Sequence, residues 1–586
     1  MTATPSLGGN IMSPKLIYRC LAGSALALTS AQANAQATAP SSITPSTLRP
    51  AQPDSGLQIS IPESGGLGPP AGAEKLSVQL GAVVVEGGFP ELAATTDAAI
   101  ARIKGRRVSL TEIYQVASDI EAAHARAGFV LARVTVPPQS LNDGGTLRIV
   151  VIDGYVEDID VAGVPARVRY VVARRLASLK GRHHVTLEQI ERPLLIASEV
   201  PGLTMRSTLM RGVQSGGTRL VIDATQQLVA GSIGANNGLA ASLGRWSTNA
   251  QLSVNSALGL GEQFYGFVSG GYDVPKTFTA DAPVRVLGGG VVLPFGDGRL
   301  TLNPEATFAR TRPAPSTFTP ETRGDLRRLS LRTNYTLIKT RTRALTLDGT
   351  VEQIDETNLV TAFGVRISHD RFMAARLGGT YFLGGHGSTS IAVTAHLSQG
   401  LGSLGAISPA DTVASGIPYS RQGSSPNFTK LNLQVDGSMQ LGGNMLLRVT
   451  ARGQTGFGAA LFRSEQFSLE GDDAVSGVVG GVLSVDDGLT ARSELIRPIA
   501  IAGLGTHSQI APYIFVAGGI GWLAQPTIVE RHRIEAASIG AGARTDLFAF
   551  ATGFGLSAGI EYAHNFANVV DIGRADRISA TMTLHF

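Results

Sequence analysis

The last nine residues of the chain alternate between apolar and polar side chains without a break. The apolar face is Ile578, Ala580, Met582, Leu584 and Phe586, and Ser, Thr and His residues occupy the other face. A period of two indicates a β-strand with two unlike faces. In water such a strand is an exposed edge that favours aggregation. In a membrane it closes a barrel, with the apolar face on lipid and the polar face on a wet lumen.

The first 35 residues have the features of a secretory signal peptide. Lys15 and Arg19 are its charged part, residues 21–29 its apolar part, and Ala33-Asn34-Ala35 its small-residue cleavage site. The single cysteine, Cys20, lies within this segment. We therefore predict that residues 1–35 are a signal peptide and that the exported chain has no cysteine, which excludes a disulfide scaffold.

Composition narrows the class of exported protein. After the signal peptide, no run approaches the roughly 18 apolar residues that a membrane-spanning helix needs. Yet the mean hydropathy is +0.14, glycine is abundant (71 residues) and only 16% of residues are charged. A net charge of +4 without clustered blocks of charge does not suggest nucleic acid as a partner. These features favour an outer-membrane barrel.

Three regions follow the signal peptide. Residues 36–74 are rich in Pro, Ser, Ala and Gly, which predicts a disordered linker. Residues 75–153 and 154–228 each contain a strand, two helices and two more strands in that order, which predicts two small α+β modules in tandem. Each module has a helix that begins with a capping box, at Ser109 to Glu112 and at Thr186 to Gln189, and Pro193 is expected to kink the second of these helices.

Residues 229–586 lack helix signals and show repeated alternation instead. Leu329, Leu331 and Leu433 belong to apolar faces, whereas Arg332 and Arg448 belong to polar faces that suit a hydrated lumen. A membrane strand uses roughly 9–11 residues plus a connection, so this region predicts a transmembrane antiparallel β-barrel of about 16 strands.

Two modules before a barrel resemble a known family, the outer-membrane transporters of two-partner secretion (the haemolysin and filamentous-haemagglutinin secretion/activation proteins). The modules look like that family's POTRA domains. The segment from Ala127 to Val134 and the Pro137-Pro138-Gln139 that follows are similar to the signature of its first module, as is the strand from Leu147 to Gly154. Ser368-His369-Asp370-Arg371 also has the look of the family. The signature positions are Gly128, Phe129, Arg133, Pro138 and Gln139.

The resemblance implies a function. A transporter of this kind would sit in the outer membrane among its lipids, as a monomer, with the POTRA modules in the periplasm. It would bind an unfolded partner protein there and secrete it through the barrel without ATP. The secreted exoprotein would be β-helical. Met582, Leu584 and Phe586 would then be a C-terminal signal for the cell's barrel-assembly machinery.

The chain departs from the family pattern at two facing motifs. In the family, the arginine of a Val-Arg-Gly tip on the long sixth loop meets an aspartate of a Phe-x-Asp-x-Gly motif on the barrel wall. Here the loop tip reads Val475, Ser476, Gly477 and the wall motif reads Phe515, Ala517, Gly519. Both partners of the ion pair are missing. Losing both destabilises the fold less than losing one, because a single partner would remain as a buried charge without compensation. The loss either keeps transport unchanged or gives a looser or repurposed pore. The family also begins with a plug helix, for which the proline-rich 36–74 stretch is poorly suited.

The sequence offers weak candidates for chemistry. Gly400 to Gly405 matches a dinucleotide fingerprint by its letters but lacks the strand-to-helix context. His183-His184 has no third metal ligand at a suitable spacing. His369-Asp370 has no nucleophile elbow to serve, and we expect a turn beside a barrel strand there. We therefore expect no enzymatic activity, no cofactor and no bound metal ion.

Two other functions remain open from the sequence. A barrel-assembly insertase of the same superfamily also combines POTRA modules with a C-terminal barrel, although usually with more modules. A passive porin would have no use for modules that bind strands.

Overall fold

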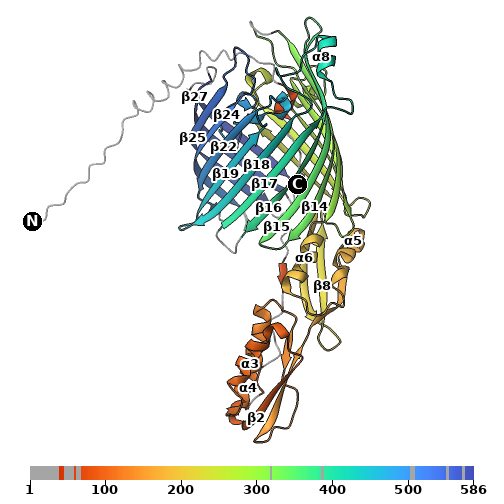
Figure 1. Cartoon of the computed structure of the whole chain (residues 1–586), viewed down its shortest axis with the longest axis vertical. Coiled ribbons are helices and arrows are strands. Elements are labelled where there is room, and N and C mark those ends of the chain that lie inside the picture. Colours follow the sequence, from red (N-terminus) through yellow and green to blue (C-terminus); the bar gives the residue numbers. More distant parts are fainter. Residues whose placement is uncertain are drawn as a thin grey trace, which may run out of the picture.

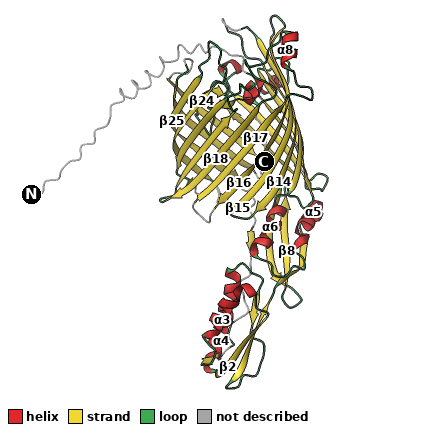
Figure 2. Ribbon diagram, viewed as in Figure 1, coloured by secondary structure: helices red, strands yellow, loops and turns green. Residues whose placement is uncertain are grey.

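Two small modules stand in line beneath a large β-barrel in the computed structural model (Figures 1 and 2). The structure describes residues 39–44, 58–60, 68–70, 72–316, 320–384, 389–501, 508–549, 554–569 and 574–586. The predicted signal peptide, residues 1–35, lies outside this range. No helix among the described residues has the length and hydrophobicity of a membrane span.

The first module is a four-stranded sheet covered by two helices. Its strands lie in the order β3-β2-β5-β4. The predicted capping box is confirmed: the Ser109 hydroxyl accepts from the Glu112 backbone N–H, and the Glu112 side chain accepts from the Ser109 backbone. The elements are β2 Ser77–Glu86, α3 Ala93–Ala101, β3 Arg107–Ser109, α4 Leu110–Arg126, β4 Arg133–Thr135 and β5 Gly145–Ile152. The apolar side of α4, including Ile113 and Ile120, packs on β5 residues Leu147 and Ile149 in a closed core.

The second module repeats this arrangement next to the barrel. Its sheet has the order β7-β8-β6, and a segment from the predicted linker, β1 (Gln58–Ser60), adds a parallel strand beside β7. The elements are β6 Tyr155–Gly163, α5 Ala166–Leu176, α6 Leu187–Ser198, β7 Leu203–Arg211 and β8 Gly217–Gln226. The Thr186 capping box is confirmed, and α6 runs through Pro193.

The barrel closes on itself through antiparallel pairing of sixteen strands, as the alternation predicted. The strand β23 (Ile499–Ala500) continues β22 beyond Pro498. The strands are β9 Val229–Asn236, β10 Ser247–Asn255, β11 Gln263–Gly271, β12 Val284–Phe295, β13 Leu300–Thr311, β14 Thr322–Lys339, β15 Arg343–Val360, β16 Val365–Gly384, β17 Thr389–Leu401, β18 Thr429–Leu441, β19 Met445–Thr455, β22 Asp487–Ile496, β24 Gln509–Trp522, β25 Arg533–Ala549, β26 Phe554–Ala567 and β27 Arg574–His585.

The two faces of the barrel wall differ in chemistry. On β14, Arg328, Ser330 and Arg332 are buried toward the interior, whereas Leu331 between them is exposed on the outside. This is the expected order for a strand with lipid on one side and a polar lumen on the other. The extracellular loop between β17 and β18 carries a short helix, α8 (Pro409–Ser415).

Candidate functional site

The barrel interior is filled by the loop between β19 and β22, residues 456–486, which is the sixth extracellular loop. Its base is anchored by Glu465, whose carboxylate pairs with Arg376 of β16 at 2.7 Å and with Lys430 of β18 at 2.9 Å. All three side chains are largely buried. Loss of either cation would leave a buried carboxylate with less compensation, so the pairing resists loop movement.

The loop holds its own shape inside the barrel. β20 (Phe467–Ser468) and β21 (Ser484–Val485) pair as a two-stranded ribbon. The Glu470 carboxylate then accepts backbone hydrogen bonds from Gly481 at 2.5 Å and Leu483 at 3.1 Å. A buried carboxylate satisfied by several N–H donors makes the turn between the two strands rigid.

The loop tip lies against the wall that β22, β24 and β26 form. Val475 and Ser476 are buried. Gly477 has φ +80°, and a side chain there would meet Ala563 Cβ at 2.7 Å and Asn565 Nδ2 at 2.6 Å. Both the backbone conformation and the close approach to β26 therefore require glycine at the tip.

An arginine of the wall, Arg492 on β22, meets the tip at Ser476. Its Nη1 donates to Ser476 Oγ at 2.8 Å, and its guanidinium also pairs with Glu494 at 2.8 Å and with Glu561 at 2.6 Å. Only 2% of the Arg492 side chain is exposed. Arg544 makes two further 2.8 Å hydrogen bonds to Glu494. The tip thus docks on a network of two arginines and two glutamates, in which Arg492 and Glu494 are buried and Arg544 is partly exposed.

The wall motif that the sequence singled out surrounds this network. Phe515 lies under Arg492, whose guanidinium carbon is 3.7 Å from the ring centroid, a cation–π geometry. Ala517 is buried and is the register partner of Arg492 across β22 and β24. A Cβ on Gly519 would lie 3.4 Å from Leu469 Cβ of the loop. The structure therefore brings tip and wall motif to the same side of the lumen.

The sequence did not single out Arg492. The chain carries an arginine at this contact, but it comes from the wall and not from the loop. Its nearest sequence signal is the alternation Thr490, Arg492, Glu494 along β22, where every second residue is polar and buried.

A short N-terminal segment also occupies the lumen. Residues Pro40–Ile43 form one helical turn, α2, with Pro40 at the first helical position, where its missing N–H costs nothing. The Ser41 hydroxyl donates to Glu356 of β15 at 3.0 Å, and Pro40 fills the space beside Gly324 of β14. Residues 40–43 and 58–60 thus have regular structure within the region for which the sequence predicted a disordered linker.

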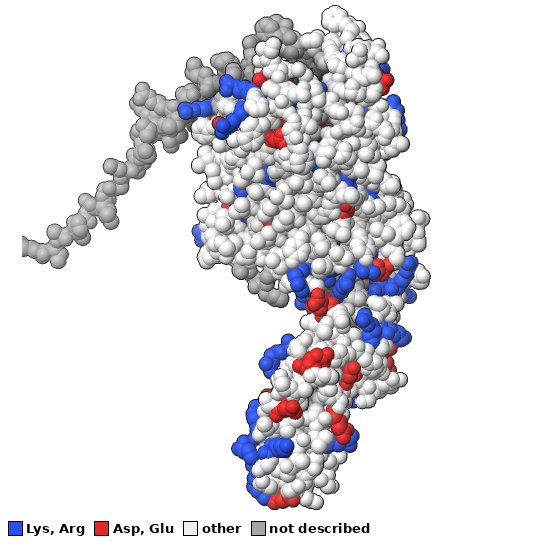
Figure 3. Space-filling model, in the orientation of Figure 1, with Lys and Arg blue, Asp and Glu red and all other residues white. Residues whose placement is uncertain are grey.

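The second module is attached to the barrel by ion pairs at the periplasmic turn between β14 and β15. Lys339 pairs with Glu199 at 2.5 Å, and Arg341 pairs with Glu191 of α6 at 2.8 Å. Figure 3 shows Lys and Arg residues gathered where the modules meet the barrel. Arg175 of α5 lies beside another turn at Gly298, and burial lowers the pKa of its guanidinium to about 10, so it stays charged at neutral pH.

The two modules meet around His184. Its ring packs on Phe89 and Phe129 of the first module, with centroid distances of 4.4 and 4.6 Å, and its Nε2 lies 3.1 Å from Glu91 Oε1. A hydrogen bond from the backbone N–H of Glu91, together with the His184 contact, holds the pKa of Glu91 below its usual value. His183-His184 thus lies at the joint between the modules, as a module loop would.

The signature residues of the first module have structural positions. Gly128, with φ +97°, ends α4, and its carbonyl accepts from the Leu187 N–H at the start of α6. Arg133 donates to the carbonyls of the turn that precedes β4. The Gln139 side chain, after Pro138, exchanges two hydrogen bonds with the backbone of Arg148 on β5. The signature therefore joins α4 to the sheet and to the second module.

The C-terminal strand completes the barrel. Met582 and Leu584 are exposed on the outside, and Phe586 exchanges backbone hydrogen bonds with Gly231 of β9. Register pairs between β27 and β9 extend only from Thr581–Asn236 to His585–Ser232, whereas β27 pairs with β26 over its whole length.

The structure corrects the expectation of a turn at His369-Asp370. His369 and Asp370 lie within β16 and not in a turn, because the strand extends well above the length that a membrane requires. The described residues contain no group of three or more His, Cys, Asp or Glu side chains that could hold a metal ion.

Comparison with known proteins gives the family. A model of the haemolysin secretion/activation proteins ShlB/FhaC/HecB matches residues 216–545, and a model of the ShlB-type POTRA domain matches residues 79–154. The first match covers more than half of the chain. The chain belongs to the haemolysin secretion/activation protein family. Members of this family are outer-membrane transporters of two-partner secretion, which carry partner exoproteins and are not enzymes. The barrel therefore lies in the outer membrane and the POTRA modules lie in the periplasm.

Individual relatives are distant. The outer membrane transporter CdiB of Escherichia coli is 28% identical over 229 residues, 39% of this chain and 37% of that protein. The heme/hemopexin transporter protein HuxB of Haemophilus influenzae is 23% identical over 27% of this chain and 28% of its own length. These alignments thus span well under half of each curated relative.

Solved structures share the fold. CdiB from Escherichia coli superposes with a TM-score of 0.65 at 19% identity, covering 99% of this chain and 100% of that one. CdiB from Acinetobacter baumannii gives a TM-score of 0.57 at 15% identity, covering 87% and 90%.

Proposed function

We propose that this transporter recognises an unfolded partner protein in the periplasm and secretes it through its own barrel without ATP. The observation that supports this most is the content of the lumen. The sixth loop and the 39–44 segment are held there by polar and ionic contacts to the wall. Apolar packing adds to these contacts, since Phe462 of the loop stacks on Phe372 of β16 at a centroid distance of 4.6 Å. Water or a passing chain can replace the polar contacts with hydrogen bonds of its own, whereas the buried ion pairs and the apolar packing keep the loop in place until a partner arrives.

Recognition would use the strand edges of the POTRA modules. In the second module, the edge of β7 binds an extended segment, since Gln58–Ser60 pairs with Arg206, Ser207 and Thr208 in parallel register. A partner segment could add to the same edge by main-chain hydrogen bonds, in place of β1. The edge lies in the module that touches the barrel, so a bound partner would be delivered close to the periplasmic mouth.

Passage requires that the lumen be cleared. The sixth loop, around residues 467–490, would be displaced, and the partner would move through either with its amino terminus leading or as a hairpin. The periplasm supplies no ATP, so folding of the partner outside the cell would give the direction. The polar wall, including Arg448 and Arg452, would give weak sliding contacts in place of a deep binding site.

The remaining features of the proposal concern partners. A β-helical exoprotein would suit a drive that comes from folding outside, because each rung can form as it emerges. Met582, Leu584 and Phe586 would be read by the barrel-assembly machinery, and the single closed barrel would act as a monomer. The loop tip and the wall motif that faces it would set how firmly the loop closes the pore. These residues are Val475, Ser476, Gly477, Phe515, Ala517 and Gly519.

Deletion of the gene tests the proposal. We expect one large exported protein to disappear from the culture medium and cell surface, and to return when the transporter is expressed in trans. If all secreted proteins persist while outer-membrane barrels fail to assemble, the chain is an insertase. If neither changes and only the uptake of small solutes falls, it is a passive porin.

A further inference from the structure

Five arginines lie on the outer surface of the barrel near its extracellular end, where the wall faces lipid and not the lumen. They are Arg285, Arg310, Arg323, Arg327 and Arg371, on the neighbouring strands β12, β13, β14 and β16. Their outward direction follows from the alternation. On β13 and β14, the residues between them, Ala309, Thr311, Leu326 and Arg328, are buried on the lumen side.

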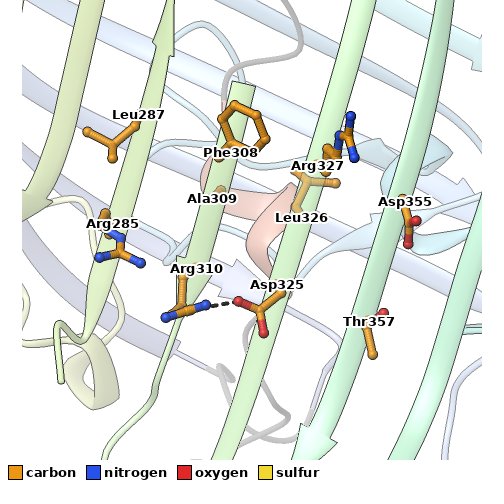
Figure 4. Close-up of a pocket in the computed structure, with 10 residues that line it drawn as sticks. All are labelled: Arg285, Leu287, Phe308, Ala309, Arg310, Asp325, Leu326, Arg327, Asp355 and Thr357. Atoms are coloured by element: carbon orange, nitrogen blue, oxygen red, sulfur yellow. Dashed lines mark hydrogen bonds and ion pairs between the residues drawn. The ribbon is translucent and has the colours of Figure 1, made fainter. Parts of the chain in front are cut away.

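Strand register arranges these arginines in two adjoining rows. One row is Arg285, Arg310, Asp325, Thr357 and His369, and the next is Leu287, Phe308, Arg327, Asp355 and Arg371. We call these two rows, with Arg323, the arginine patch. A depression of about 380 Å³ lies over the part of the patch formed by β12, β13, β14 and β15 (Figure 4).

The patch lies at the top of the apolar band. The next two outward rows toward the periplasm include Ala306, Leu329 and Met373, then Pro304, Leu331, Val351 and Ala375. Arg310 is ten residues above the periplasmic start of β13, and Arg371 is thirteen above the periplasmic end of β16. A membrane strand uses about 9–11 residues, so the patch is at the level of the outer-leaflet headgroups.

The positive charge of the patch is only partly neutralised. Asp325 accepts from Arg310 at 2.6 Å and from Arg323 at 2.7 Å, and Asp355 pairs with His369 at 2.9 Å and with Arg371 at 3.9 Å. Arg327 is exposed and makes no hydrogen bond or ion pair within the described residues. Five arginines thus face two aspartates, and Arg285, Arg310 and Arg327 line the depression.

We propose that the arginine patch binds an anionic glycolipid of the outer leaflet through its phosphate groups. Guanidinium groups favour phosphate because their donors match it in pairs. Apolar side chains at the same site, Phe308 and Leu287, would contact the acyl chains below the phosphate. A free anion or an acidic protein segment would gain nothing from this apolar lining. The site is separate from the lumen and does not depend on secretion.

The test measures lipid retained by the purified full chain. We compare the parent with the triple variant Arg310→Gln, Arg327→Gln, Arg371→Gln and with Arg327→Gln alone. The single variant breaks no hydrogen bond or ion pair among the described residues and so should fold. Arg533→Gln, an exposed arginine at the extracellular end of β25, is the matched control. Each protein is equilibrated in detergent with lipopolysaccharide, its dephosphorylated form or phosphatidylglycerol, and bound lipid is counted by native mass spectrometry.

We expect the triple variant to retain about tenfold less lipopolysaccharide than the parent, Arg327→Gln severalfold less, and Arg533→Gln the same amount. The dephosphorylated form and phosphatidylglycerol should bind the parent weakly, and millimolar inorganic phosphate should not displace lipopolysaccharide. Equal retention by parent and variants, equal retention of the dephosphorylated form or of phosphatidylglycerol, or full displacement by inorganic phosphate would overturn the proposal. So would a triple variant that loses secretion while its bound lipid is unchanged.

Discussion

Arg492 of the barrel wall donates a 2.8 Å hydrogen bond to Ser476 at the tip of the sixth loop. The contact links the loop to a buried network in which Glu494 and Glu561 share the charge of Arg492. In the family pattern the arginine lies on the loop tip, whereas here it lies on the barrel wall, on β22. The loop remains docked although both motif residues, Ser476 and Ala517, are uncharged.

Removal of Arg492 should damage the barrel more than removal of its partner on the tip. Arg492→Ala leaves the largely buried Glu561 without a cation, while Glu494 keeps Arg544, a loss of about 3 kcal/mol. Ser476→Ala removes one hydrogen bond, about 1 kcal/mol. Samples heated to increasing temperatures are compared on a gel. We expect the unfolding temperature of the barrel to fall clearly for Arg492→Ala and only slightly for Ser476→Ala. Equal shifts would show that the network does not hold the loop.

Restoring the family's charges tests the same contact. Ser476→Arg places a second guanidinium against Arg492, and Ala517→Asp adds a third carboxylate beside an arginine that already pairs with two glutamates. We expect each single variant to secrete less partner protein than the parent, with Ser476→Arg the worse because its neighbour has the same charge. The double variant should recover secretion, as measured in the culture medium. If all three variants secrete equally, these positions do not matter for transport.

A disulfide can hold the sixth loop in place. A Cβ at Gly519 would lie 3.4 Å from Leu469 Cβ, near the separation found in disulfides. The exported chain is predicted to have no other cysteine, so Leu469→Cys with Gly519→Cys should form one defined bridge. We expect the oxidised double variant to stop secreting and a reductant to restore secretion. The two single-cysteine variants are the controls. Undiminished secretion by the fully oxidised protein would show that the loop stays in place during transport.

The ion pair between Arg341 and Glu191 should hold the second module beneath the barrel. Arg341→Glu and Glu191→Arg each create a like-charge contact at 2.8 Å spacing, and we expect each to reduce secretion severalfold. The exchanged double variant should recover most of it. Because Arg341 is partly exposed, the defect of the single variants should shrink at high salt. Failure of the exchange to restore secretion would mean that these residues act separately.

The modules and the barrel strands could be predicted because their signals are local. The capping boxes at Ser109 and Thr186 and the alternation of Leu331 and Arg332 depend on neighbours a few residues away. The contact between Ser476 and Arg492 could not be predicted, since it arises only when the loop folds back into the barrel. The lumen position of Pro40 and the pairing of Gln58–Ser60 likewise depend on partners far along the chain. A proline-rich composition describes the segment in isolation and not what it meets.

The claim that a partner protein passes through this lumen can be tested directly by photo-crosslinking at two adjacent residues of β19. Arg448 faces the lumen near the periplasmic mouth, within 3.8 Å of Glu494, whereas Val449 is exposed on the lipid side. A photoreactive amino acid is placed at one position or the other in cells that are secreting. We expect the secreted protein to crosslink from position 448 and not from position 449. Crosslinks from neither position, or equally from both, would contradict passage through the barrel.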